Sequence, residues 1–217
     1  MSSSACTFQN LFSLACRERC MTNFKNIRVP KPGKIPKASA AVLVPMCRVN
    51  DVTSLLYTVR STSLRTNSGQ VAFPGGKTDN EESPIQTALR ETEEEIGLSS
   101  TKIDVWGHGP SVPGRDYKMM ITPVVGCVSD LRQEDLQINA NEVMEVFTVP
   151  IEILCDTKNQ YYTQFKNGFI LPVYVADEYK IWGITAYITH MFLSSLLPRD
   201  VYRNEWIKKK IIIKDEM

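Results

Sequence analysis

The amino-acid sequence predicts an α/β fold built around a mixed β-sheet. Stretches rich in β-branched residues, such as 38–46 and 52–60, predict strands. They are interleaved with a capped helix over 84–96 and an almost wholly apolar helix over 184–197. Strands that alternate with a few helices are typical of α/β proteins. With 217 residues, the chain has the length of one large domain or of a domain with extensions.

The remaining elements follow along the chain. Residues 1–37 predict a basic N-terminal extension, rich first in Ser and Cys and then in Lys and Pro. A polar loop after residue 60 leads to a short strand that stops at Pro74, Gly75 and Gly76. Further strands are expected near residues 102–107, 119–128, 145–149, 169–175 and 180–183. The last segment, 201–217, is predicted to be a tail that forms either an edge strand or a frayed end, which leaves 38–200 as the folded domain.

The composition excludes several classes of protein. Twenty-five Lys and Arg residues against 24 Asp and Glu residues give a formal net charge of +1, which disfavours nucleic-acid binding by bulk charge. No stretch approaches about 18 uninterrupted apolar residues, so no membrane span is expected. The six cysteines are irregularly spaced without a CxxC pair, which predicts free thiols in a reducing compartment. The sequence makes no prediction of the oligomeric state.

The near-zero net charge conceals an asymmetry between the extension and the rest of the chain. Residues 1–50 carry eight basic residues and one acidic residue, so the remainder is net acidic. A Ser- and Arg-containing, acid-poor N-terminus resembles a mitochondrial transit peptide, and an exposed basic tail is the alternative. The sequence thus predicts a mitochondrial location, with the cytoplasm as the alternative.

The helix over 84–96 has defined ends. Ser83 can cap its N-terminus, Pro84 suits the first helical position, and Gln86 completes a Ser-x-x-Gln capping box. Gly97 stands where a left-handed residue commonly ends a helix. The apolar stripe that should pack on the sheet consists of Ile85, Ala88, Leu89, Thr92 and Ile96.

Three glutamates lie largely opposite that stripe. Glu91, Glu94 and Glu95 are spaced i, i+3 and i+4, where like charges repel, and they lie near the helix C-terminus, where the dipole disfavours acids. A hard divalent cation, Mg²⁺ or Mn²⁺, would compensate, since it prefers carboxylate oxygens and water. A solvated acidic face is the alternative reading of the run alone.

This segment resembles the Nudix box, G-x5-E-x7-R-E-U-x-E-E-x-G-U, in which U is apolar. The matching positions are Gly76, Glu82, Arg90, Glu91, Glu94, Glu95, Gly97 and Leu98. Thr92 occupies the first apolar position, and its methyl group can still face the core. The resemblance implies a Nudix fold, an α/β/α sandwich around a mixed sheet with the box as a loop–helix–loop. It also implies hydrolysis of a nucleoside diphosphate linked to another moiety.

The residues before the box are similar to the LLTxRSxxLRxHxGxVxFPGG pattern of the coenzyme A diphosphatase subgroup. The matching residues are Arg60, Ser61, Leu64, Arg65, Gly69, Val71 and Phe73. Asn67 replaces the usual His. The runs 141–150 and 181–186 also look like this subgroup, and the similarity covers about residues 38–195. It is greatest to the mitochondrial animal form, and the chain ends in 215–217 without the Ser-Lys-Leu-like peroxisomal address.

The resemblance implies roles for individual residues in a metal-dependent diphosphatase that acts on coenzyme A or acyl-CoA. The predicted metal ligands are Glu91, Glu94 and Glu95, and Glu82 is either a fourth ligand or a simple loop charge. Arg90 is expected to orient a neighbouring glutamate. The candidates for the general base are Glu94, Glu95, Glu142 and Glu145.

Phosphates of the substrate are expected to meet the residues just before the box. Arg60 and Arg65 could pair with phosphates, and Ser61 and Leu64 are weaker candidates. Gly75 and Gly76 allow a tight turn beside the substrate, and a structural turn explains them equally well. The alternatives to coenzyme A are another Nudix substrate, such as NADH, ADP-ribose or a damaged nucleotide, and a catalytically silent Nudix binding module.

Overall fold

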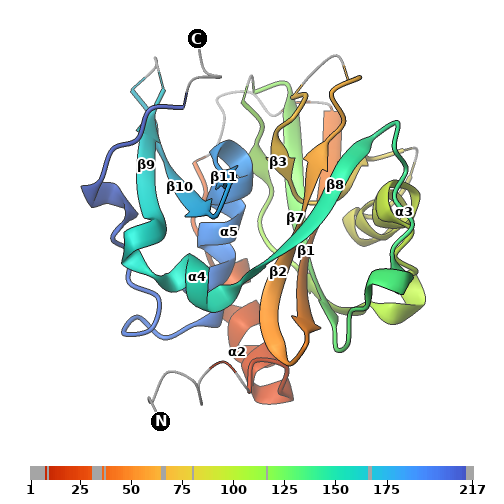
Figure 1. Cartoon of the computed structure of the whole chain (residues 1–217), viewed down its shortest axis with the longest axis horizontal. Helices are drawn as coiled ribbons and strands as arrows, with labels where there is room; N and C mark the ends of the chain where they lie inside the picture. The colour runs from red at the N-terminus through yellow and green to blue at the C-terminus, as the bar shows by residue number, and fades with distance from the viewer. Residues whose placement is uncertain are drawn as a thin grey trace.

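The computed structural model describes residues 8, 10–30, 36, 38–64, 67–79, 81–115, 117–165 and 168–213. Its main sheet has eight strands (Figure 1). The central path runs in the order β3 (Val71–Ala72), β2 (Val52–Arg60), β1 (Ala38–Val49), β7 (Met119–Val128) and β5 (Asp104–His108). Three further strands pair with members of this path: β4 (Gly75–Lys77) with β1, β6 (Val112–Pro113) with β7, and β8 (Val143–Pro150) with β2.

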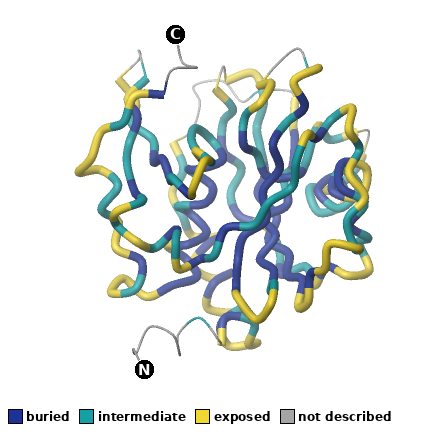
Figure 2. The backbone as a smooth tube through the Cα atoms, viewed as in Figure 1, coloured by how far each residue is buried: buried dark blue, intermediate teal, exposed yellow. Residues whose placement is uncertain are grey.

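The main sheet is mixed, as the sequence predicts. β1 and β7 are parallel over ten residue pairs, from Ala38–Met119 to Cys47–Val128. Every other pairing in this sheet is antiparallel. Because β1 is paired on both sides, it lies at the centre of the molecule and is largely buried (Figure 2). The strand that carries the two glycines, β4, is therefore attached directly to the most buried strand of the fold.

Helices cover both faces of this sheet. α3 (Pro84–Ile96) packs on one face, and α2 (Leu14–Lys25) and α5 (Gly183–Leu196) pack on the other (Figure 1). The side chains of β1 alternate between the two cores, since Leu43 and Cys47 face α3 whereas Val44 and Met46 face α2 and α5. The predicted α/β/α sandwich is therefore confirmed.

A second, three-stranded sheet lies beside the sandwich. Its strands are β9 (Gln160–Gln164), β10 (Ile170–Ala176) and β11 (Tyr179–Ile181), and the short helix α4 (Ile151–Cys155) leads into it. The single-turn helices of the chain are η1 (Ser100–Lys102), η2 (Gln133–Asp135), η3 (Thr157–Asn159) and η4 (Trp206–Lys208). The sequence predicts β10 and β11 but misses β9 and α4.

The C-terminal segment is not frayed up to the last described residue. Lys210 forms an isolated parallel bridge with Tyr162 of β9. Tyr202 and Ile213 are buried, at 4% and 6% exposure. Residues 201–213 thus belong to the folded domain, which corrects the predicted domain end at residue 200 and decides against the frayed end. Residues 214–217 lie outside the described residues.

The prediction of an exposed basic tail is wrong for the segment that forms α2. Cys20 and Phe24 are fully buried, and Phe24 packs edge-on against Phe192 of α5 with ring centroids 6.2 Å apart. Arg19 and Asn23 donate hydrogen bonds to the carbonyls of Leu196 and Ser195 at the end of α5. These carbonyls have no partner within the helix, so α2 completes the C-terminus of α5 as well as covering it. Use of the segment as a targeting signal stays a prediction.

The described cysteines Cys16, Cys20, Cys47, Cys127 and Cys155 are free thiols. Burial raises the pKa of Cys20 and of Cys47 to about 12, so these thiols stay protonated at neutral pH.

Among the described helices, none has the length and apolar character needed to cross a membrane.

Phe24→Ala should destabilise the whole domain, because it removes a fully buried ring from the interface of α2 and α5. We expect a loss of about 3–5 kcal/mol in the free energy of unfolding measured with urea. Leu14→Ala in the same helix removes a side chain that is 68% exposed and should cost less than about 0.5 kcal/mol. Equal, small losses for both variants would show that α2 is not part of the cooperative core.

Candidate active site

The helix that carries Glu91, Glu94 and Glu95, α3, forms as the sequence predicts. The Ser83 hydroxyl accepts a hydrogen bond from the Gln86 amide, and the Gln86 side chain accepts one from the Ser83 amide, which completes the capping box. Gly97 is left-handed with φ 69° and ends the helix. Thr92 is fully buried, and its hydroxyl donates to the Ala88 carbonyl at 2.7 Å, so a polar residue is accommodated in the apolar stripe.

Arg90 is the centre of the polar network on α3. Its Nε and Nη2 donate to Oε1 and Oε2 of Glu82 at 2.7 and 3.0 Å, a bidentate pair. Its Nη1 donates to Glu91 at 2.9 Å and to Glu94 at 3.0 Å, and its Nη2 also donates to the Lys77 carbonyl at 3.1 Å. Arg90 therefore ties together the loop before the helix, the end of β4 and two glutamates of the helix.

Glu82 has both carboxylate oxygens engaged by protein donors. Besides the two bonds from Arg90, Oε2 accepts hydrogen bonds from the Thr87 hydroxyl at 3.0 Å and the Asp79 amide at 3.3 Å. The hydrogen bond from Arg90 is the main reason that the pKa of Glu82 falls to about 2. Of the two roles that the sequence leaves open for Glu82, this geometry favours the anchoring of the loop.

Glu91 lies directly against the backbone of β4. A Cβ atom placed on Gly76 would lie 2.3 Å from Oε2 of Glu91, so the close approach requires glycine at this position. The side chain of Glu91 is 15% exposed. Its burial is the main cause of a raised pKa, and the charges of Glu94 and Glu142 add to the effect against that of Arg90.

Glu95 is the most buried carboxylate of the site, with 3% exposure. Its Oε2 accepts a hydrogen bond from the Gly75 amide at 3.1 Å, and its Oε1 lies 3.9 Å from Nη1 of Arg60. Burial raises the pKa of Glu95 to about 7, although the Gly75 amide and Arg60 favour the charged form. Gly75 has φ 148° and packs on the Ala41 carbonyl of β1, so it too must be glycine.

The two later glutamates lie in different surroundings. The loop that carries Glu142 is bonded to the end of α3, since the Asn139 amide donates to the Glu95 carbonyl at 2.9 Å, and the charge of Glu142 adds to the raised pKa of Glu91 and of Glu95. Glu145 lies on the opposite face of the sheet, where Tyr179 donates to its Oε1 at 2.5 Å. Tyr179 itself stacks on Phe147 with ring centroids 3.7 Å apart. Glu145 is therefore placed away from the other carboxylates.

The residues before the box are partly engaged within the protein. Ser61 is buried, and its hydroxyl pairs with that of Ser63 at 2.9 Å. The Nε of Arg60 is buried and has no hydrogen-bond partner among the described residues. Leu64 donates its amide to the Ser61 carbonyl in the turn that follows β2. Arg65 lies outside the described residues.

The position of the usual His and the two histidines of the chain show no link to the carboxylates. Asn67 has φ 54°, a conformation that Asn tolerates better than most residues. His190 is half-buried on α5, where desolvation lowers its pKa to about 4 and its Nδ1 pairs with the Tyr202 hydroxyl at 2.9 Å. His108 pairs with the Gly109 carbonyl. Both histidines thus have hydrogen-bond partners outside the group of carboxylates.

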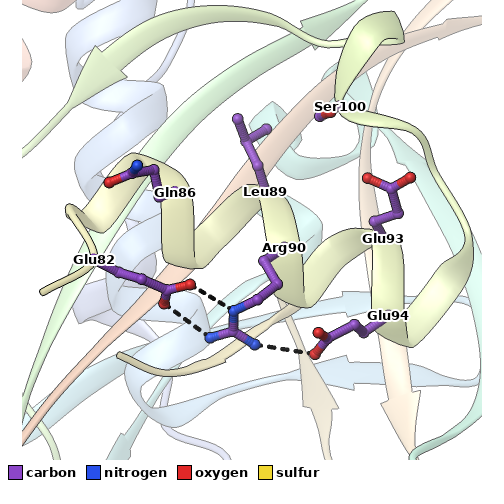
Figure 3. A pocket seen from close by; sticks show the side chains of 7 residues that line it. All are labelled: Glu82, Gln86, Leu89, Arg90, Glu93, Glu94 and Ser100. Carbon is purple, nitrogen blue, oxygen red and sulfur yellow. Dashed lines mark hydrogen bonds and ion pairs between the residues drawn. The ribbon is translucent and has the colours of Figure 1, made fainter. Parts of the chain in front are cut away.

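A pocket of about 440 Å³ lies along the exposed side of α3 (Figure 3). The residues that line it are Glu82, Gln86, Leu89, Arg90, Glu93, Glu94 and Ser100. It shares Glu82, Arg90 and Glu94 with the site but contains neither Glu91 nor Glu95. Arg90 thus links this open pocket to Glu91, which approaches β4.

Comparison with known proteins identifies the family. The NUDIX domain matches residues 37–169, so the chain belongs to the Nudix hydrolase family. The relative named mitochondrial coenzyme A diphosphatase NUDT8, from Mus musculus, is 45% identical over 167 residues, which cover 74% of this chain and 79% of the relative. Nudix hydrolase 3 of Caenorhabditis elegans is 35% identical over 225 residues, covering 93% of this chain and 92% of the relative.

Solved structures also resemble this chain. A Nudix hydrolase from M. smegmatis, RenU, is 22% identical with a TM-score of 0.47 and covers 56% of this chain and 75% of its own. An Ap4A hydrolase from C. elegans is 19% identical with a TM-score of 0.44 and covers 53% and 81%.

Nudix hydrolases depend on a divalent metal ion, and the donors at this site fit such an ion. Glu91, Glu94 and Glu95 offer only carboxylate oxygens, the ligands that hard divalent cations prefer. Burial raises the pKa values of Glu91 and Glu95 although Arg90 and Arg60 favour their charged forms, and a bound cation would favour them further. Among the described residues, no three Asp, Glu, His or Cys side chains already converge on one point. The sequence does not predict the role of Thr87, whose hydroxyl donates to Glu82, because this hydrogen bond belongs to no recognisable motif.

Gly76→Ala should reduce activity more than stability. The added methyl group displaces the carboxylate of Glu91, the flexible end of a side chain, rather than the backbone. We expect kcat for pyrophosphate hydrolysis to fall at least about 10-fold, since small misplacements of catalytic groups are costly. Gly114→Ala is the matched control, because its nearest neighbour would lie 3.4 Å away. Full activity of Gly76→Ala would contradict the placement of Glu91.

The metal-free protein should lose stability as the pH rises from about 4.5 to about 7. Glu95 has a folded pKa of about 7 against 4.5 for the free side chain, so the folded state binds the extra proton in this range. The loss is on the order of 3 kcal/mol. Urea unfolding with a chelator at pH 5 and pH 8 measures it.

The matched variant for this measurement is Glu95→Gln, which removes the ionisable group. Its stability should change less between pH 5 and pH 8 than that of the wild type. If the curves of wild type and Glu95→Gln run parallel, the account of the Glu95 pKa is wrong.

Proposed function

We propose that this Nudix hydrolase cleaves the pyrophosphate bond of coenzyme A and acyl-CoA. The products would be 3′,5′-ADP and 4′-phosphopantetheine or its acyl form. The observation that carries the proposal is the placement of Arg60, a residue of the subgroup signature, 3.9 Å from Glu95 of the Nudix box. The names of the relatives from mouse and human, both coenzyme A diphosphatases, support the same substrate.

Glu91, Glu94 and Glu95 would hold the metal ion, Mg²⁺ or Mn²⁺. When bound, such an ion neutralises the charge of the pyrophosphate and lowers the pKa of water. Arg90 would keep Glu91 and Glu94 in place through its bidentate pair with Glu82. Since Glu94 and Glu95 are needed as ligands and Glu145 lies on the other face of the sheet, Glu142 is our candidate for the general base.

In this scheme a water oxygen bonds to one phosphorus and the bridging P–O bond breaks. The proton of the water passes to Glu142, and the leaving phosphate departs with the electron pair of the broken bond. Arg60 would pair with a substrate phosphate, because its buried Nε has no partner among the described residues. Arg65, which lies outside the described residues, is proposed to do the same. Gly75 and Gly76 let the substrate approach the backbone beside Glu91 and Glu95.

A product screen tests the proposed function. The purified chain should convert coenzyme A with Mg²⁺ or Mn²⁺ into two products with the masses of 3′,5′-ADP and 4′-phosphopantetheine. NADH and ADP-ribose serve as competing substrates, and Glu95→Gln as the control for a contaminating activity. Turnover of NADH or ADP-ribose with coenzyme A left intact would contradict the proposed specificity. Ligand binding without any turnover would indicate a silent Nudix module.

The protein is proposed to act in mitochondria, as the names of the relatives from mouse and human indicate for those proteins. Deletion of residues 1–37 would also remove α2 from the core, so a fusion is the cleaner test. Residues 1–37 joined to a fluorescent protein should enter mitochondria, and Arg17→Glu with Arg19→Glu in the fusion should prevent import. A diffuse signal from the unmodified fusion would contradict this proposal.

A further inference from the structure

The loop over residues 137–142 is attached to the C-terminal end of α3. The amides of Gln137 and Asn139 donate to the carbonyls of Ile96 and Glu95 at 2.7 and 2.9 Å. Gly97 permits the crossing, since a Cβ atom there would lie 2.6 Å from that of Gln137. The loop thus satisfies the last carbonyls of the helix and contacts α3 at Glu95 and at the residue that follows it.

Asn139 organises the remainder of this loop. Its carbonyl accepts hydrogen bonds from the amides of Glu142 and Val143 at 3.0 and 2.9 Å. Its Oδ1 accepts one from the Asn141 amide at 3.2 Å, which closes the turn. Its Nδ2 donates to Oε1 of Glu142 at 3.4 Å. One side chain therefore fixes both the turn and the carboxylate that the turn presents.

The same loop is held from its other side by the segment that follows β2. The Ser61 amide donates to the Glu142 carbonyl at 2.8 Å. The Ser63 hydroxyl donates to the Asn141 carbonyl at 3.2 Å. With its backbone fixed on both sides, the direction of the Glu142 side chain depends on Asn139. The charge of Glu142 acts on Glu91 and Glu95 of α3, and Arg60 of β2 lies 3.9 Å from Glu95.

We propose that Asn139 is a positioning residue that holds the Glu142 carboxylate toward the glutamates of α3. It acts through Glu142 and not on the substrate. The inference rests on the proposed function in one respect, namely that Glu142 takes the proton from the attacking water. It does not depend on coenzyme A being the substrate.

Two variants separate this role from the support of the turn. Asn139→Asp and Asn139→Ser both keep an oxygen that can accept from the Asn141 amide, and both lose the Nδ2 donor to Glu142. We expect each to lower kcat about 10-fold with KM changed less than about twofold, as is typical for groups that orient a catalytic side chain. Thermal melting should show both proteins folded, and the Ser variant serves if the Asp variant does not fold.

A double-mutant cycle with Glu142→Gln decides between positioning and structure. The cycle uses whichever substrate the wild type turns over, so a failed coenzyme A assignment leaves it intact. In the Glu142→Gln background, either Asn139 variant should reduce kcat less than about twofold further. Asn141→Asp, an exposed position in the same loop, controls for the added charge and should stay within about twofold of wild type. A 10-fold loss in both backgrounds, or none in either, would overturn the proposal.

Discussion

The bidentate ion pair between Arg90 and Glu82 is the interaction on which the site depends. Glu91 and Glu94 are one helical turn or less from each other and from Glu95, and like charges at this spacing oppose helix formation. The guanidinium satisfies Glu91 and Glu94 with one nitrogen while its other two nitrogens anchor it to Glu82 and to the Lys77 carbonyl. Arginine suits this position because its planar fork makes several directed bonds at once, which a lysine cannot do.

The backbone of β4 imposes the second constraint. Two consecutive glycines let the strand pack closely against β1 on one side and against Glu91 on the other. The same close approach brings the Gly75 amide to Glu95. Burial raises the pKa of Glu95, which is buried, and of Glu91, which is partly buried, and a bound cation would oppose this rise. Burial with perturbed pKa values makes these carboxylates candidates for metal ligands rather than a solvated face.

The sequence predicted the box well because its contacts are local. The cap of α3, the stripe on the sheet and the glutamate spacing all follow from a single helix. The sequence does not predict the elements whose position depends on packing between residues far apart in the chain. The polar and basic composition of the α2 segment predicts an extension, although Ser13 caps the helix and Cys16, Cys20 and Phe24 recur at helical spacing.

The choice between Glu142 and Glu145 also lay beyond the sequence. The two residues are three apart in the run 141–150, and an unbroken strand places neighbours on alternate faces. In the structure, Val59 pairs with Glu145 whereas Arg60 pairs with Val143, so the register shifts by one residue at this point. This β-bulge lies between the turn that holds Glu142 and the strand position of Glu145, so strand alternation alone does not place the two carboxylates. The position of this shift is determined by the pairing of β8 with β2, which lies far away in the sequence.

The most direct test of the central role of Arg90 is the rate of pyrophosphate hydrolysis by Arg90→Lys as a function of metal concentration. Lysine keeps the positive charge but cannot make the bidentate pair with Glu82 while bonding Glu91 and Glu94. The account predicts a rate at saturating metal at least about 10-fold below wild type, in a protein whose melting temperature shows that it is folded. A wild-type rate for Arg90→Lys at saturating metal would contradict it.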